Sequence, residues 1–171
     1  MKRFAFTRRS AALVTVALVA VGAAGIYVLP SGAQEPPPPI AAEPLSPRSV
    51  FPDDLSLKVK LKVDGGATRV VNVRDPSRIA VVRFTVQPGA QFPWHTHPGP
   101  VFVNVASGAL TLVDSEDCRE HTYTAGQAFV DLGHGHVHTA FNPASEPTTL
   151  VATFFEAPAQ GSLLIPAEPA C

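Results

Sequence analysis

The feature that most constrains the fold is a series of short segments with the two-residue period of β-strands. From residue 55 onward, apolar runs of four to nine residues alternate with clusters of glycine, proline, asparagine and aspartate. Many short strands separated by turn residues are typical of an antiparallel sandwich or barrel. Because no segment after residue 33 has a helical period of useful length, we predict an all-β domain. The expected strands are 55–63, 69–73, 79–86, 101–105, 109–113, 127–130, 138–141 and 149–155.

The first of these runs has one apolar and one cationic face. Leucine and valine at the odd positions of 55–63 alternate with Lys58, Lys60 and Lys62. Successive side chains of a strand point to opposite faces, so the lysines share one side. We interpret them as a solvated face that also protects a strand edge from pairing with other chains.

The N-terminus has the pattern of an export signal. Four basic residues lie within residues 1–9, an uncharged segment follows at 10–29, and the small residues 31–33 offer a cleavage site. About 20 helical residues also suffice to cross a bilayer, so the same segment would serve as an anchor if it were retained. Residues 1–33 therefore predict a signal peptide or a signal anchor. The protein is expected to be secreted, or held on the outer face of the cytoplasmic membrane.

Composition divides the rest of the chain into three parts. Residues 34–52 are rich in Pro and Ala, include four consecutive prolines, and show no apolar period, which favours an extended, disordered tether. Residues 53–160 carry the strand pattern of the domain, and 161–171 form a C-terminal tail. Without residues 1–33 the chain has nine basic and fourteen acidic residues, so nucleic acid is not an expected partner.

The chain contains two cysteines, Cys118 and Cys171. In an oxidising, exported compartment two cysteines most simply form one disulfide, which here would tie the tail to the domain. Two free thiols or an intermolecular bridge are the alternatives.

Histidines gather at two places in the strand pattern. His95 and His97 are two residues apart, so on a strand they project from the same face. A second group, His134, His136 and His138, follows about forty residues later, far enough along the chain to lie on a facing strand. Imidazole nitrogens bind divalent metals at about 2.0 to 2.1 Å, so the two groups together predict a metal site.

At these residues the sequence resembles the cupin family, a small jelly-roll β-barrel that often holds a metal. Gly89 is followed after five residues by His95-Thr96-His97, and the closing glycine of the first cupin motif falls at Gly108. The family's glutamate has no counterpart here, because Val101 or Phe102 stands at its position.

The second cupin motif is matched best at its C-terminal end. Gly126 opens it, and Gly135, His138 and Asn142 follow in the family's order, although the motif proline is missing and one extra residue precedes Gly135. The resemblance covers about 79–155 and implies a single cupin barrel. It also implies a homodimer as the expected assembly.

The resemblance implies that His95, His97 and His138 are the ligands of one divalent metal ion, with Fe, Mn, Zn, Ni and Cu all suited to imidazole. His136 is a candidate fourth ligand or, alternatively, a histidine at the rim of the barrel. We interpret His134 as a turn residue and His121 as exposed in a polar connection. Asp131 either supports the ligand group or caps a turn.

Two classes of function remain open from the sequence. A redox metal with three histidines and free coordination positions predicts a small-molecule oxidoreductase of dioxygenase type, and zinc in the same site would instead favour hydrolysis. The alternative is a non-catalytic barrel that binds a small molecule or metal as a sensor or carrier. No catalytic residue beyond the metal ligands can be named, because no acid or base is placed beside them by a motif.

Overall fold

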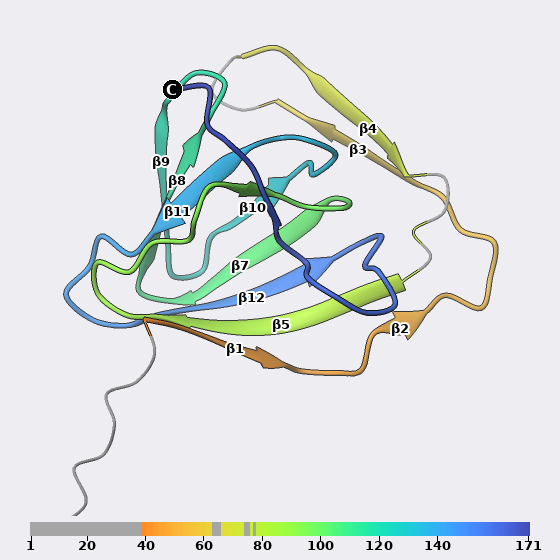
Figure 1. The fold of residues 1–171 in the computed structure, drawn as a ribbon, viewed down its shortest axis with the longest axis horizontal. Coiled ribbons are helices and arrows are strands. Elements are labelled where there is room, and N and C mark those ends of the chain that lie inside the picture. The colour runs from red at the N-terminus through yellow and green to blue at the C-terminus, as the bar shows by residue number, and fades with distance from the viewer. Residues whose placement is uncertain (1–38, 63–65, 74–75, 77) are drawn as a thin grey trace, which may run out of the picture. The chain divides into compact units, whose positions relative to one another are not determined.

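The computed structural model describes residues 39–62, 66–73, 76 and 78–171 (Figure 1). These residues form thirteen β-strands and no helix, which confirms the all-β prediction. Each of the eight expected runs overlaps one strand, and the structure adds β1, β2, β6, β9 and β13. The strands are β1 (Ile40–Pro44), β2 (Ser49–Val50), β3 (Leu57–Leu61), β4 (Arg69–Val73), β5 (Arg78–Val86), β6 (His95–Thr96), β7 (Val101–Ser107), β8 (Ala109–Asp114), β9 (Glu120–Thr124), β10 (Ala128–Asp131), β11 (His138–Phe141), β12 (Thr148–Phe154) and β13 (Ile165–Pro166).

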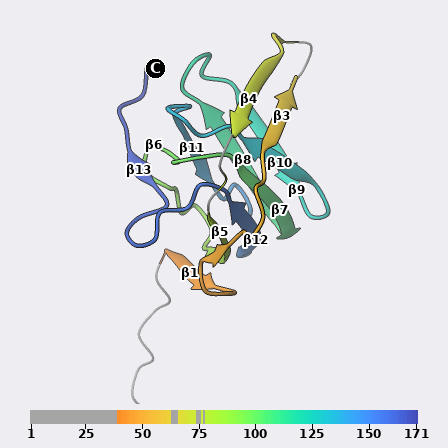
Figure 2. The same cartoon turned by 90° about the vertical axis from the view of Figure 1, so that its right-hand side faces the viewer.

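Two antiparallel sheets face each other as in a jelly roll (Figure 1). One has the strand order β1-β5-β12-β7-β10, with β2 also paired to β5, and the other has the order β13-β6-β11-β8-β9. The strands β3 and β4 form a separate hairpin, with Lys58 paired to Asn72 and Lys60 to Val70. Figure 2 shows this hairpin projecting beyond the two sheets. Both hairpin lysines are exposed, as the alternation predicted.

The core lies between the inner faces of the sheets. On β5, β12 and β7 alternate residues are buried, and the register places Phe84 beside Leu150 and Val82 beside Ala152. Side chains from the facing sheet, including Leu110 and Leu112, pack against this layer. The two-residue alternation therefore produces one continuous apolar interior, which is the expected consequence of stacking two half-buried sheets.

Part of the segment expected to be a disordered tether is a β-strand. Residues 40–44 pair along their whole length with β5, from Ile40 opposite Val86 to Pro44 opposite Val82. The prediction was wrong here because an edge strand gains backbone hydrogen bonds without needing an apolar period, and proline is tolerated at an edge. Residues 34–38 lie outside the described residues.

The C-terminal tail belongs to the folded domain, which therefore does not end at residue 160. Strand β13 pairs with β6, and Leu163 packs against the core. Cys118 and Cys171 form a disulfide with a Cα–Cα distance of 6.1 Å, in agreement with the predicted bond between the tail and the domain. The tail thus adds an edge strand to the sheet that carries the histidines.

The connection that contains His121 is not irregular. Glu120–Thr124 forms β9, which pairs with β8 and places His121 opposite Leu112. Since Leu112 faces the interior, His121 also faces inward and is half-buried. The expectation that His121 is simply exposed was wrong, because polar residues alternate along this edge strand and hide its period.

The predicted signal or anchor at 1–33 lies outside the described residues. Within the part of the chain that the structure describes, we find no helical segment with the length and hydropathy of a membrane span.

Candidate metal centre

Three predicted ligands meet inside the sandwich. His95 on β6 pairs directly with His138 on β11, and His97 follows two residues after His95. The three side chains belong to residues that are at most 6% exposed, and they offer one ligand atom each within 4.8 Å of one another. Ring centroids are 4.4 Å apart for His95 and His138, and 4.8 Å apart for His95 and His97. The pairing of β6 with β11 therefore brings His95 and His138 into contact, although about forty residues separate them in the sequence.

Backbone carbonyls fix the rings of the first two histidines. His95 Nδ1 lies 2.6 Å from the Pro93 carbonyl oxygen, and His97 Nδ1 lies 2.8 Å from the Leu163 carbonyl oxygen. A carbonyl oxygen can only accept, so in both rings Nδ1 carries the hydrogen. In the neutral ring this leaves the Nε2 lone pair free to bind a metal.

The surroundings keep these two rings neutral. Burial lowers the pKa of His95 to about 3, and the neighbouring His138 and His97 rings contribute to this lowering. Burial also lowers the pKa of His97, against the opposing effects of the Leu163 carbonyl and Asp131. Neutral imidazole is the form that binds metal, so both side chains are in the ligating state at neutral pH.

The third histidine faces a carboxylate instead of a carbonyl. His138 Nδ1 lies 3.2 Å from Asp131 Oδ2, but the geometry of this contact falls short of a good hydrogen bond. Among the described residues this buried nitrogen has no other hydrogen-bond partner. Asp131 is 1% exposed. Burial alone would raise the pKa of Asp131, but its contacts with His136 and His138 outweigh burial and hold the pKa well below its usual range.

His136 is held away from the triad by two carboxylates. Its Nδ1 lies 2.5 Å from Asp131 Oδ2 and its Nε2 lies 2.9 Å from Asp114 Oδ2. Burial lowers the pKa of His136, but Asp131 and Asp114 raise it to about 9 overall. Of the two alternatives for His136, this arrangement favours the rim position over a fourth ligand, because both ring nitrogens already face acids. It joins Asp131 and His138 in a second cluster of potential ligands.

Two further motif residues have structural positions. His134 has a positive φ of 52° in the turn after β10, and its Nε2 contacts the Glu156 carboxylate, in agreement with a turn residue. Asn142 is 1% exposed and donates from Nδ2 to the carbonyl oxygens of Val86 and Glu146. It ties together the loop that follows β11.

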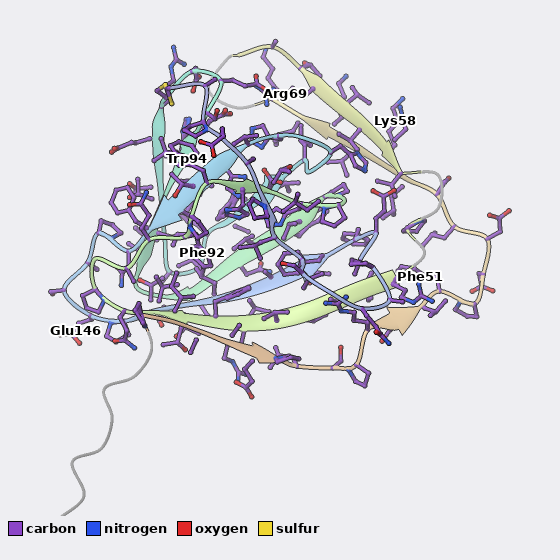
Figure 3. All side chains as sticks on the ribbon, viewed as in Figure 1. Phe51, Lys58, Arg69, Phe92, Trp94 and Glu146 are labelled. Carbon is purple, nitrogen blue, oxygen red and sulfur yellow. A yellow bond between two sulfur atoms is a disulfide. The ribbon has the colours of Figure 1, made fainter. Side chains whose placement is uncertain are left out.

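A small cavity of about 50 Å³ adjoins the triad. Besides the three histidines its only ionisable lining residue among those described is Asp131, and the rest of the wall is apolar. Phe92, labelled in Figure 3, comes from the segment before β6 and lies in this wall beside Phe84. The site therefore combines a nitrogen-rich cluster with a predominantly apolar chamber.

A second cavity of about 180 Å³ lies on the other side of Leu112, between the hairpin and β8–β9. Its wall mixes apolar side chains with the charged or titratable residues Arg69, Asp114, Arg119 and His136. Arg69, labelled in Figure 3, pairs with Glu116 and lies 3.9 Å from Asp114. Sequence reasoning did not find Asp114, because no spacing rule relates it to the histidines and only the pairing of β8 with β11 brings it near.

Comparison with known proteins agrees with this fold. Residues 82–154 match the family model Cupin_2, described as a cupin domain. No curated protein matches the sequence. The family match, the strands and the histidine cluster agree in identifying residues 82–154 as a cupin-type domain.

Similar solved structures are related only distantly. A cupin-2 domain protein from Shewanella frigidimarina is 20% identical, with 46% of this chain and 71% of that chain covered and a TM-score of 0.39. A double-stranded β-helix domain protein from Klebsiella pneumoniae is 24% identical over 52% of this chain and 76% of that chain, with a TM-score of 0.44. The polyketide cyclase RemF from Streptomyces resistomycificus is 18% identical over 67% and 75%, with a TM-score of 0.44. We take no function from these likenesses.

Proposed function

We propose that His95, His97 and His138 hold one divalent metal ion and that the protein is a small-molecule oxidoreductase of dioxygenase type. The observation that carries the proposal is the convergence of three buried histidines, two of which have Nδ1 occupied by a carbonyl and Nε2 free. Three imidazoles suit Fe, Mn, Zn, Ni and Cu. A metal bound there would supply Lewis-acid chemistry and, if redox-active, electron transfer to a small molecule.

The protein's own residues would bind and shield the reacting molecule. Apolar side chains, among them Phe84, Phe92 and Phe129, line the chamber and would exclude water from it. The described residues place no general base in the chamber apart from Asp131, which is already engaged by neighbouring groups. This wall favours a small, predominantly apolar substrate over a charged one.

The size of the chamber supports a second candidate function. Ligand pockets usually measure about 300 to 1,000 Å³, whereas the cavity beside the triad is about 50 Å³. A non-catalytic sensor or carrier that holds a metal, or a very small molecule, fits such a chamber without any opening motion. The two functions differ in whether a bound molecule is converted.

Metal content is the first test. The full chain, kept in mild detergent and purified without a histidine tag or chelator, is expected to carry about one equivalent of metal by elemental analysis. A His95→Ala, His97→Ala double variant is expected to carry none, because it keeps only His138 of the triad. The neighbouring His136 does not replace the lost ligands, since both of its ring nitrogens are engaged by Asp131 and Asp114. His134→Ala removes a histidine outside the triad and is the matched control, expected to bind as the parent does.

Failure of both parent and variant to bind any supplied divalent metal, with circular dichroism showing both folded, would contradict the metal proposal. For the metal-loaded parent, an oxygen electrode and a panel of small aromatic and aliphatic molecules separate the two functions. Oxygen uptake that the double variant lacks supports the oxidoreductase. Reversible binding without any conversion supports the carrier.

A further inference from the structure

We propose that Asp131 is the positioning residue that fixes the ring of His138 for metal binding, and that His136 holds Asp131 in place. This inference rests on the proposed metal site, and it concerns the one ligand whose orientation depends on another side chain.

The three ligands differ in the group that faces Nδ1, the ring nitrogen that points away from the centre of the triad. His95 and His97 each face a backbone carbonyl, from Pro93 and Leu163, whose positions are set by the chain itself. His138 faces Asp131 Oδ2 at 3.2 Å and has no other polar neighbour at Nδ1 among the described residues. A substitution at Asp131 therefore removes the one hydrogen-bond acceptor that the described residues place near Nδ1 of this ring.

Strand pairing directs Asp131 at the triad. It is the last residue of β10 and pairs with Val101 of β7, whose side chain lines the same cavity. Asp131 is 1% exposed, and its Oδ1 accepts a hydrogen bond of 2.8 Å from the Gly133 amide. The carboxylate is thus fixed at one oxygen and presents the other to the histidines.

Oxygen Oδ2 selects one form of His138. A carboxylate can only accept, so its position favours a hydrogen on His138 Nδ1 and leaves Nε2 free. All three ligands then present the same nitrogen to the centre of the cluster. Carboxylate partners of metal-binding histidines also raise the basicity of the ring and compensate part of the metal's charge.

His136 completes the support from the other side. Its ring bridges Asp131 Oδ2 and Asp114 Oδ2, at 2.5 and 2.9 Å. Asp114 is fixed in turn by the Glu116 amide, which donates to its Oδ1 at 2.8 Å. A row of four side chains, His138, Asp131, His136 and Asp114, therefore joins the triad to the cavity beneath the hairpin.

The first measurement needs no metal. Nitrogen-15 NMR of the full metal-free chain near pH 7.5 reports which ring nitrogen of His138 carries the hydrogen. We expect Nδ1–H in the parent and a mixture of both forms in Asp131→Asn, because the asparagine amide can present a donor where the carboxylate presented an acceptor.

The second measurement is the affinity for Zn²⁺ alone, by competition with a coloured chelator. Asp131→Asn is expected to weaken binding by about 10- to 100-fold, the usual effect of losing such a partner. His136→Gln, which removes the support of Asp131, is expected to cause a smaller loss and a partial change of the His138 form. Glu156→Gln alters a carboxylate that pairs with His134 outside the triad, and it is the matched control expected to leave the affinity unchanged.

If Asp131→Asn binds Zn²⁺ as tightly as the parent does and its His138 ring form is unchanged, this inference is overturned. The proposed metal site of three histidines would not be affected by that result. Absence of Zn²⁺ binding by the parent would count against the proposed function, and the ring form in the parent and Asp131→Asn would still decide the role of Asp131. If Asp131→Asn does not fold, the parent spectrum decides alone: Nδ1–H on His138 supports the inference, and Nε2–H overturns it.

Discussion

At the scale of single residues, the turn between β10 and β11 illustrates how little space surrounds the candidate site. Gly133 has a positive φ of 61°, and a Cβ atom added to it would collide with the backbone carbonyl of Gly99. Its amide also holds Asp131. The residue is glycine both because of its backbone conformation and because another segment of backbone approaches closely.

We predict that Gly133→Ala destabilises the protein by about 3 kcal/mol or more, since left-handed backbone strain and a backbone collision add together. Gly126→Ala is the matched control, because Gly126 also has a positive φ, of 84°, but has nothing near the added Cβ. The control should lose only about 1 to 2 kcal/mol. Urea unfolding followed by circular dichroism measures both, and equal losses would contradict the role given to Gly99.

At the scale of elements, the tail is part of the candidate site. Strand β13 pairs with β6, which carries His95, and the Leu163 carbonyl fixes His97. Further along, the Ala170 amide donates to the Ser115 hydroxyl close to the disulfide. Two of the three ligands are therefore supported by residues beyond the matched family segment, which ends at residue 154.

We predict that a Cys118→Ser, Cys171→Ser variant loses about 4 kcal/mol of unfolding free energy, because the bond restricts an unfolded loop with a sequence separation of 53. Denaturant unfolding measures the loss, and the parent in excess reductant should match the variant. The variant should still bind metal under native conditions, since β13 remains paired with β6. Equal stability with and without the bond would contradict this prediction.

At the scale of the whole molecule, we propose that the chain is exported. Support comes from the basic and apolar pattern of residues 1–33 and from the Cys118–Cys171 disulfide, a bond typical of oxidising compartments. Fractionation of cells that produce the full chain is expected to place it outside the cytoplasm. Mass measurement of the product then separates cleavage near residue 33 from an intact anchor.

Recovery of the full-length chain with reduced cysteines in the cytoplasm would contradict export. Replacing Arg8 and Arg9 with glutamate should retain the chain inside the cell, because signal peptides need a positively charged start. Glu43→Gln changes a charge on β1 instead and is the control, expected to be exported normally. The homodimer implied by the family resemblance stays a prediction.

Local pattern sufficed for the strands and for the pair of histidines, because side-chain alternation and the spacing of His95 and His97 are properties of consecutive residues. Each of the eight alternating runs overlaps a strand, and the family resemblance implied that His138 is the third ligand. The edge strands carry no such local signal. Residues 40–44 and Glu120–Thr124 gain their order from backbone hydrogen bonds to neighbours, which their own side chains do not reveal.

The tertiary structure decided what surrounds the ligands. The sequence left two roles open for Asp131, support of the ligand group or capping of a turn, and only the pairing of β10 with β7 directs it at His138. The Leu163 carbonyl contacts His97 although 66 positions separate the two residues in the sequence. Asp114 contacts His136 across a separation of 22 positions. Such contacts depend on where strands lie relative to one another, so the residue types could indicate a metal site while the orientation of each ring required the fold.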